Sequence, residues 1–210
     1  MASFSSCWQC GQPVSELSCP ACGALQKPPA GFFHFFGIPE RLSLDVDDLQ
    51  KRFYELSRKL HPDRYGRKPA TERQYSEEAT SILNDGYRTL RDPVKRAGYV
   101  LKQHGLDIGE QRSKNVPPEL LEEVFELNMA LEELRGGDES VRPQLEEAGR
   151  KFNGMLEGAD RELETQFLRY DQCRDEAVLG AIRGILNRRR YIQNLVNEVE
   201  KELSGSALSN

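Results

Sequence analysis

No stretch of the 210-residue sequence approaches the roughly 18 consecutive apolar residues that cross a lipid bilayer. Aromatic residues are also scarce: they make up 8% of the chain, and there is a single tryptophan. Charged residues make up 30%, and the mean hydropathy is -0.66. This balance is typical of a soluble protein made of amphipathic helices, and neither a sheet-rich core nor a membrane-spanning segment is expected.

The sequence has no excess of positive charge either. Its formal net charge is -5, so the phosphate backbone of a nucleic acid would repel the molecule as a whole. The first residues, Met1 to Phe4, contain neither the arginine-rich pattern of a transit peptide nor the apolar core of a secretory signal. We therefore expect no nucleic-acid or membrane partner. The expected location is the bacterial cytoplasm or, for a processed chain, the mitochondrial matrix.

Four of the five cysteines lie within the first 22 residues as two Cys-x-x-Cys-Gly motifs, Cys7 with Cys10 and Cys19 with Cys22. Such crowding indicates a local metal site rather than a disulfide framework. Each motif places two thiolates on one tight turn, and four thiolates suit a tetrahedral, structural zinc ion. Iron is the alternative, because rubredoxin-like sites and iron–sulfur clusters use the same ligands. The fifth cysteine, Cys173, is expected to be a buried or partly buried thiol.

The segment around these motifs is short and is followed by linker-like sequence. Eight residues separate the two motifs, fewer than in the common zinc ribbon. Glycines and two consecutive prolines stand between Cys22 and Phe32. We therefore expect residues 1–28 to form a separate small unit that has no core and is folded by the metal.

Residues 30–105 carry the pattern of an antiparallel helical pair. Apolar residues recur every three or four positions over residues 49–60 and again over residues 79–90. Pro62 ends the first helix, Pro93 ends the second, and a shorter helical pattern follows. The sequence therefore predicts two long helices joined by a tip loop.

The second half of the chain predicts a three-helix bundle and an all-α fold. Residues 106–118 show no periodicity and end in two prolines, which is typical of a linker. Three helical patterns with short breaks fill residues 119–205. The core stripes are Leu120, Val124, Leu127, Leu131 and Leu134 in the first helix and Val178, Ile182, Ile185, Ile192, Val196 and Val199 in the third.

The tip loop contains His61, Pro62 and Asp63. Proline fixes its own φ and disfavours a helical residue before it, so His61 and Asp63 are expected on a stiff, exposed loop. No nucleophile motif or phosphate-binding glycine loop accompanies them, so an enzyme is not expected. Basic residues flank the loop and form a face that can attract an acidic partner: Lys51, Arg52, Arg58, Lys59 and Arg64.

The basic helix, the loop and the segment from Tyr87 to Tyr99 together resemble the J domain. J domains bind DnaK-type heat-shock chaperones and stimulate their ATP hydrolysis. The resemblance implies that the His61, Pro62 and Asp63 loop and its five basic neighbours contact such a chaperone. None of these residues would be catalytic in itself.

The whole chain is similar to the HscB family of J-type iron–sulfur cluster co-chaperones. The resemblance is carried by the segments from Phe33 to Pro39 and from Arg96 to Gly105 and by the acidic helical bundle, and the cysteine motifs resemble the long, metal-binding members. It implies a J domain and a bundle in an L-shaped arrangement. It also implies a monomer or weak dimer that binds the iron–sulfur cluster scaffold protein and delivers it to a DnaK/HscA-type chaperone.

The first bundle helix has more apolar residues than one core stripe needs. Leu121, Phe125 and Met129 form a second stripe among glutamates, with no basic residue between positions 119 and 134. We expect one stripe to face outward as an apolar ridge with an acidic rim; alternatively, the extra stripe packs on the linker or on the J domain. The resemblance assigns scaffold binding to Leu121, Phe125, Glu126, Met129, Glu133 and Tyr191, while Glu122 and Met129 exchange acidic and apolar character relative to the family pattern.

Two other functions use some of the same features. A general J-domain co-chaperone would bind extended, unfolded clients, and a zinc-dependent nucleic-acid or redox protein would need a basic or reactive knuckle. Residues 1–26 contain no lysine or arginine, which argues against nucleic-acid binding by the knuckle. The run from Arg188 to Arg190 is expected to be a solvated face.

Overall fold

The computed structural model describes residues 5–106 and 117–205. The chain divides into two compact units, Met1–Arg96 and Ala97–Asn210, and each is described by itself. Seven α-helices and one two-stranded sheet form the regular structure of the described residues, which confirms the all-α fold class. Within those residues no helix has the length and apolar character needed to span a bilayer. Most of the predicted linker, residues 107–116, lies outside the described residues.

The N-terminal cysteine segment forms a small hairpin, which we call the knuckle and which comprises the described residues of the segment 1–28. Strands β1 (Ser5–Ser6) and β2 (Pro13–Val14) pair antiparallel, with Ser5 opposite Val14. The segment after the last cysteine is buried: Leu25 has no exposed surface, and its N–H donates to Glu72 on the third helix. The knuckle therefore packs into the first compact unit, and the residues that directly follow the last cysteine motif are buried in it rather than exposed.

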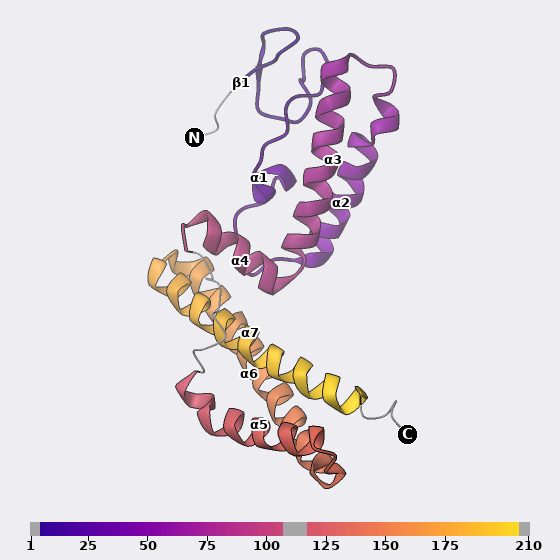
Figure 1. Ribbon diagram of the computed structural model, residues 1–210. Coiled ribbons are helices and arrows are strands. Elements are labelled where there is room, and N and C mark those ends of the chain that lie inside the picture. Colours follow the sequence, from indigo (N-terminus) through magenta and orange to yellow (C-terminus); the bar gives the residue numbers. More distant parts are fainter. Residues whose placement is uncertain (1–4, 107–116, 206–210) are drawn as a thin grey trace. The chain divides into compact units, whose positions relative to one another are not determined.

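The rest of the first unit is a helical hairpin preceded by a short helix (Figure 1). Helix α1 (Phe32–Phe36) leads to α2 (Val46–Leu60), the 3-10 turn η1 (Pro62–Arg64) and α3 (Ala70–Leu90). The Asp45 carboxylate caps α2 by accepting from the N–H groups of Asp47 and Asp48. Helix α2 ends at Leu60, two residues before Pro62, as predicted.

Helices α1 and α3 approach closely at a glycine. A Cβ atom added at Gly86 would lie 3.0 Å from the Phe36 ring and 3.1 Å from the Phe32 ring. The buried Arg96 then fixes the end of the hairpin, since its Nε donates to the Leu42 carbonyl oxygen at 2.8 Å. Helix α4 (Pro93–Gln103) contains the boundary between the two units.

The second unit contains the predicted three-helix arrangement. The turn η2 (Pro118–Leu120) leads to α5 (Leu121–Arg135), and η3 (Glu139–Val141) leads to the long antiparallel pair α6 (Arg142–Cys173) and α7 (Glu176–Gly205) (Figure 1). Every residue of the two predicted core stripes is buried. The burial of both stripes confirms the helical periodicity on which the bundle was predicted.

Two minor predictions about the second unit are wrong. Cys173 is exposed, because it is the last residue of α6 and precedes Arg174, which leaves the helix in a left-handed conformation with φ of 54°. The arginine run of α7 is paired rather than merely solvated: Arg188 bonds Glu162, and Arg189 Nε donates to Asp160 at 2.6 Å. These ion pairs join α7 to α6.

Candidate metal centre and docking surfaces

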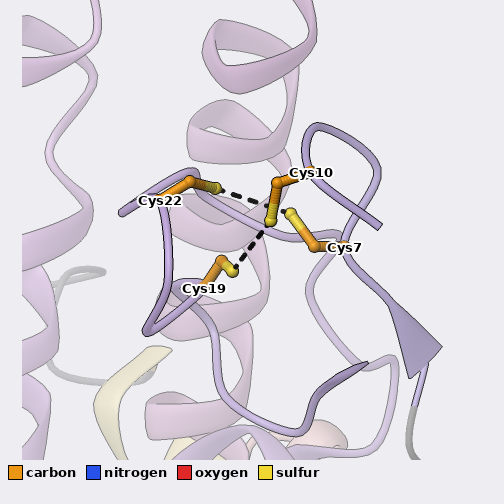
Figure 2. Close-up of side chains that lie close together, drawn as sticks. All are labelled: Cys7, Cys10, Cys19 and Cys22. Atoms are coloured by element: carbon orange, nitrogen blue, oxygen red, sulfur yellow. Dashed lines mark hydrogen bonds between the residues drawn. The ribbon is translucent and has the colours of Figure 1, made fainter. Parts of the chain in front are cut away.

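The four N-terminal cysteines meet at one point (Figure 2), and all their sulfur atoms lie within 4.8 Å of one another. The Sγ atoms of Cys7 and Cys22 are 3.7 Å apart, as are those of Cys10 and Cys19. A tetrahedral zinc ion with Zn–S bonds of about 2.3 Å separates its sulfur ligands by about 3.8 Å. The donor type, number and spacing therefore fit a four-thiolate metal site.

Backbone and amide groups around the cluster face the sulfur of Cys7. The N–H of Gln9 donates to Cys7 Sγ at 3.4 Å, and Gln26 Nε2 donates to the same atom at 3.3 Å. The glycines that follow the motifs, Gly11 and Gly23, have φ of 76° and 74°, a conformation that a residue with a side chain adopts with strain. Each glycine lets its motif close as a tight turn.

The pKa values of the Cys7 and Cys22 thiols are shifted in opposite directions. Burial works to raise the pKa of Cys7, but hydrogen bonds from the backbone of Cys10 and Gln9 and from neighbouring thiols lower it to about 6. The backbone of Ala24 works to lower the pKa of Cys22, but burial and the neighbouring thiols raise it to about 12. Four sulfurs this close therefore resist ionising together, and a divalent cation would remove that repulsion.

The loop between α2 and α3 is exposed but ordered by its own hydrogen bonds. His61 Nδ1 accepts from the N–H of Asp63 at 3.3 Å, and the N–H groups of Arg64 and Tyr65 donate to the carbonyls of His61 and Pro62. The side chains of His61 and Asp63 are 56% and 90% exposed. With Nδ1 engaged, Nε2 is the imidazole nitrogen that a partner can reach.

The predicted basic face divides into two groups. Lys51, Arg58 and Lys59 are exposed, and within residues 5–106 and 117–205 none of them forms an ion pair with a carboxylate. Arg52 instead pairs with Asp48 at 2.7 Å, and Arg64 donates to the carbonyl of Arg58. Lys51, Arg58 and Lys59 are therefore available to a partner. Arg52 and Arg64 are already engaged, one with a carboxylate of α2 and the other with a carbonyl at the end of α2.

Helix α5 exposes its second apolar stripe. Leu121, Phe125 and Met129 are 56%, 66% and 49% exposed, so this stripe forms an apolar ridge on the surface of the second unit. The alternative that the stripe packs on the linker involves residues outside the described ranges. Exposure of three large apolar side chains on one helix face is typical of a protein-binding surface.

The acidic residues of α5 differ in whether they have partners. Glu123 pairs with Lys151 of α6 at 3.4 Å, and Arg135 at the other end of α5 bonds Glu202 of α7 at 2.6 Å. The backbone N–H of Glu123 and then Lys151 lower the pKa of the Glu123 carboxyl against the effect of burial. Within the described part of the chain, Glu126 and Glu133 form no ion pair and border the ridge.

A groove lies beside the ridge, between α5 and α6, and was not predicted from the sequence. Its volume is about 320 Å³, and Glu126 stands on its rim. The apolar walls come from both helices: Leu127, Ala130, Leu145, Ala148 and Phe152. No pattern within one helix signals such a groove, because it depends on how two helices pack.

Tyr191 is the one predicted scaffold-binding residue outside α5. It is partly buried against the core of the bundle. Burial, and then the charge of Glu198, raise the pKa of its hydroxyl. The structure therefore shows Tyr191 as a core-packing residue that keeps part of its ring exposed.

Two family models match the chain, one over the helical hairpin and the other over the helical bundle. Residues 32–99 match the DnaJ domain, and residues 116–200 match the HSCB C-terminal oligomerisation domain. The first match contains the His61 loop and the second contains the ridge.

Curated relatives and solved structures carry the same family name. The chain is 33% identical to the human iron-sulfur cluster co-chaperone protein HscB over 63% of this chain and 59% of that protein. It is 30% identical to the mouse protein of the same name over 77% of this chain and 75% of that one. A crystal structure of human HscB matches with a TM-score of 0.71 at 28% identity, covering 94% of this chain and 98% of that one.

A chaperone HscB from Vibrio cholerae also matches, with a TM-score of 0.60 at 26% identity over 85% of this chain and 99% of that one. The match with the mouse protein covers most of both chains and shows the family of this chain. One domain match contains the loop, and the other contains the ridge. The chain belongs to the HscB family of iron–sulfur cluster co-chaperones, with a J domain and an N-terminal group of four cysteines suited to a metal.

Proposed function

We propose that this protein binds an iron–sulfur cluster scaffold protein on its C-terminal bundle and delivers it to a DnaK/HscA-type chaperone, whose ATPase it stimulates through the His61, Pro62 and Asp63 loop. The observation that supports the proposal is the presence, in one chain of this family, of two exposed surfaces of unlike chemistry. One is a polar loop beside cations, and the other is an apolar ridge beside glutamates. The chain acts on its partners and has no reaction of its own.

The loop is suited to the chaperone because it needs little ordering when it binds. Pro62 and the hydrogen bonds around His61 and Asp63 hold the backbone before any partner arrives. The cations of Lys51, Arg58 and Lys59 attract an acidic surface and speed its encounter with the loop. Arg52 and Arg64 belong to the same surface but act mainly by holding α2 and the loop in place.

The ridge is suited to a folded scaffold protein. Full burial of each large apolar side chain on binding contributes about 1.5–3 kcal/mol before the costs of association. Leu121, Phe125 and Met129 supply this apolar contact, and Glu126 and Glu133 select a partner with basic groups at the edge. We also assign the exposed part of the Tyr191 ring on α7 to scaffold binding.

We assign the cysteine site to zinc, held by Cys7, Cys10, Cys19 and Cys22 in a structural role. Four thiolates leave no coordination position for a substrate. Protein purified without added metal is expected to contain zinc at one equivalent and to be colourless. One equivalent of iron with visible absorbance would contradict the assignment.

The proposal divides the chain into a zinc knuckle (residues 1–28), a J domain (30–105), a linker (106–118) and a scaffold-binding bundle (119–205). Limited proteolysis tests this division, since cleavage between intact domains concentrates in linkers. Early cleavage is expected within residues 106–118. Early cleavage between residues 26 and 30 would instead favour a knuckle that is not fixed to the J domain.

The experiment that tests the chaperone contact is the His61→Gln substitution. The variant is expected to lose stimulation of the cognate chaperone's ATPase, because the loop loses its imidazole. Its affinity for the scaffold protein, measured by calorimetry, should equal that of the unsubstituted chain and serves as the folding control. Persistent stimulation by the variant would sink the chaperone assignment.

A competition experiment separates this function from that of a general J-domain co-chaperone. Folded scaffold protein and an unfolded model peptide are offered together to the labelled chain. The scaffold is expected to displace the peptide at concentrations where the peptide fails to displace the scaffold. The reverse order would favour a protein that delivers unfolded clients.

A further inference from the structure

We propose that the knuckle is a metal-dependent brace of the J domain, with Glu72 as the positioning residue that joins them. The metal would thereby hold the end of the α2–α3 hairpin that carries the His61 loop, and its loss would weaken chaperone recruitment while sparing the bundle. The functional part of this inference rests on the proposed function. The structural part stands on contacts between the knuckle, α3 and the end of α2.

Leu25 is the point at which the knuckle attaches to α3. Its side chain is fully buried, and its backbone N–H donates to Glu72 Oε2 at 3.1 Å in a buried hydrogen bond. Its carbonyl oxygen accepts from Trp8 Nε1 at 2.7 Å. Both polar backbone groups of Leu25 are thus engaged, one by the J domain and one by the first cysteine motif.

Trp8 makes a second contact across the same interface. It stands between Cys7 and Cys10, and its ring meets Tyr75 of α3 edge to face, with 6.5 Å between the ring centroids. Since the turn that carries Trp8 is formed by two metal-binding cysteines, the position of its ring depends on that turn. The metal site and α3 are therefore linked at Leu25 and at Trp8.

Burial of the Glu72 carboxylate would cost more free energy without the hydrogen bond that the knuckle donates to it. A carboxylate out of water needs hydrogen bonds to its oxygens, and the Leu25 N–H supplies one from a backbone that is held in place. Glu72 lies near the start of α3, which begins at Ala70, where the helix dipole also favours a negative charge. The residue is therefore placed to couple two segments rather than to bind a mobile partner.

The N-terminal part of α3 also contacts Leu60, the residue directly before the His61 loop. Ser76, one helical turn after Glu72, donates its hydroxyl to the carbonyl oxygen of Leu60 at 2.6 Å in a buried hydrogen bond. Leu60 is the last residue of α2 and directly precedes His61. A short path therefore runs from the cysteines through Leu25, Glu72 and Ser76 to the loop.

A groove of about 1080 Å³ separates the knuckle from α1 and α2. Its walls include Gln26 and Lys27 on the knuckle side, and Arg52, Lys59 and Leu60 on α2. Because Lys59 and Arg52 belong to the predicted chaperone-binding face, unfolding of the knuckle would remove one wall of a cavity that this face lines. Loss of the metal would thus change the surroundings of the residues that we propose to bind the chaperone.

The test compares Glu72→Ala with Glu77→Ala in the full chain. Glu77 is an exposed glutamate on the same helix, and among the described residues no hydrogen bond or ion pair joins it to the knuckle, so it is the matched control. Glu72→Ala is expected to release its metal to a chromogenic chelator several-fold faster than the unsubstituted chain. It should also increase hydrogen exchange at Arg64 and Tyr65 and reduce ATPase stimulation several-fold. Scaffold affinity should stay unchanged, and Glu77→Ala should show none of these effects.

Metal removal from the unsubstituted chain gives a second readout. Trp8 is the single tryptophan, so tryptophan fluorescence reports on the knuckle and on its contact with Tyr75. Chelation is expected to change this fluorescence and to increase exchange at Arg64 and Tyr65, with no change in α5 to α7. If Glu72→Ala does not fold, Trp8→Phe keeps an aromatic ring against Tyr75, removes the donor to Leu25 and is expected to speed metal release.

The outcomes separate this inference from the proposed function. Metal release and exchange in Glu72→Ala equal to those of Glu77→Ala, or a metal-free chain with unchanged exchange at Arg64 and Tyr65, would overturn the brace. If the unsubstituted chain stimulates no chaperone while metal removal still loosens the loop, the proposed function fails and the structural brace stands. If metal loss loosens the loop and lowers stimulation, both stand.

Discussion

The loop surface of the J domain and the ridge surface of the bundle differ in how their side chains are supported. The loop consists of polar groups on a backbone fixed by Pro62 and by hydrogen bonds, beside three cations, Lys51, Arg58 and Lys59, that have no carboxylate partner among the described residues. The ridge consists of apolar side chains on a regular helix, α5, beside glutamates. A charged surface governs encounter rate and salt dependence, whereas an apolar surface governs affinity. The two partners that we propose would therefore be attracted by opposite chemistry on one chain.

The sharpest contrast within α5 itself is between its buried and exposed stripes. Leu131→Ala removes a fully packed side chain from the bundle core and should lower the free energy of unfolding by about 2–5 kcal/mol. Chemical denaturation followed by circular dichroism measures the loss. Unchanged stability would mean that α5 contributes little to the bundle core.

The ridge should behave in the opposite way. Leu121→Ala combined with Phe125→Ala is expected to weaken scaffold binding by about 2 kcal/mol or more, with little change in stability, because both side chains already face solvent. Calorimetric titration with the folded scaffold protein gives the affinity. Leu168→Ala on α6 is the matched control, since Leu168 is also 56% exposed but lies outside the ridge. An equal loss in the control would remove the special role of the ridge.

The cations of the loop surface should affect rate more than affinity. Arg58→Glu combined with Lys59→Glu is expected to weaken chaperone binding by about 1 kcal/mol at low salt, mainly through slower association. Stopped-flow association at two ionic strengths measures the effect, which should shrink as salt rises. The same variant should bind scaffold normally. A salt-independent loss would indicate damage to the loop backbone.

The ion pair between α5 and α7 predicts a small pH effect confined to the bundle. Arg135 lowers the pKa of Glu202 below its usual value of 4.5 through a hydrogen bond and its charge. A carboxyl whose folded-state pKa is lowered stabilises the fold above its unfolded pKa, and this stability is lost as the pH falls through the folded value. Glu202→Gln should therefore flatten the acid-side loss of stability in urea unfolding. An acid-side profile that the substitution leaves unchanged would contradict this prediction.

The parts of the structure that follow local periodicity were predictable. Both stripes of α5 could be identified from i+3 and i+4 spacing, and the structure buries one and exposes the other. The loop could be placed because Pro62 restricts its neighbours whatever the rest of the chain does. The four cysteines were grouped correctly because two short motifs carry their own turn geometry.

The parts that depend on long-range packing were not predictable. Leu25 and Glu72 lie 47 residues apart, and no periodic pattern connects them. Glycine and proline near Leu25 indicated a linker, although its side chain is fully buried. The pairing of Arg188 with Glu162 was missed for the same reason, since it depends on the register of α7 against α6. Exposure of Cys173 follows from where α6 ends, and single-sequence patterns locate helix ends poorly.

One measurement tests most directly whether the two surfaces act separately within one co-chaperone. The chaperone's ATPase rate is followed as scaffold protein is added to the unsubstituted chain or to the variant that combines Leu121→Ala with Phe125→Ala. The variant should keep the stimulation seen without scaffold, and half-maximal response to scaffold should need roughly 30-fold more of it, which corresponds to about 2 kcal/mol. Loss of the scaffold-free stimulation, or an unchanged response to scaffold, would contradict the account.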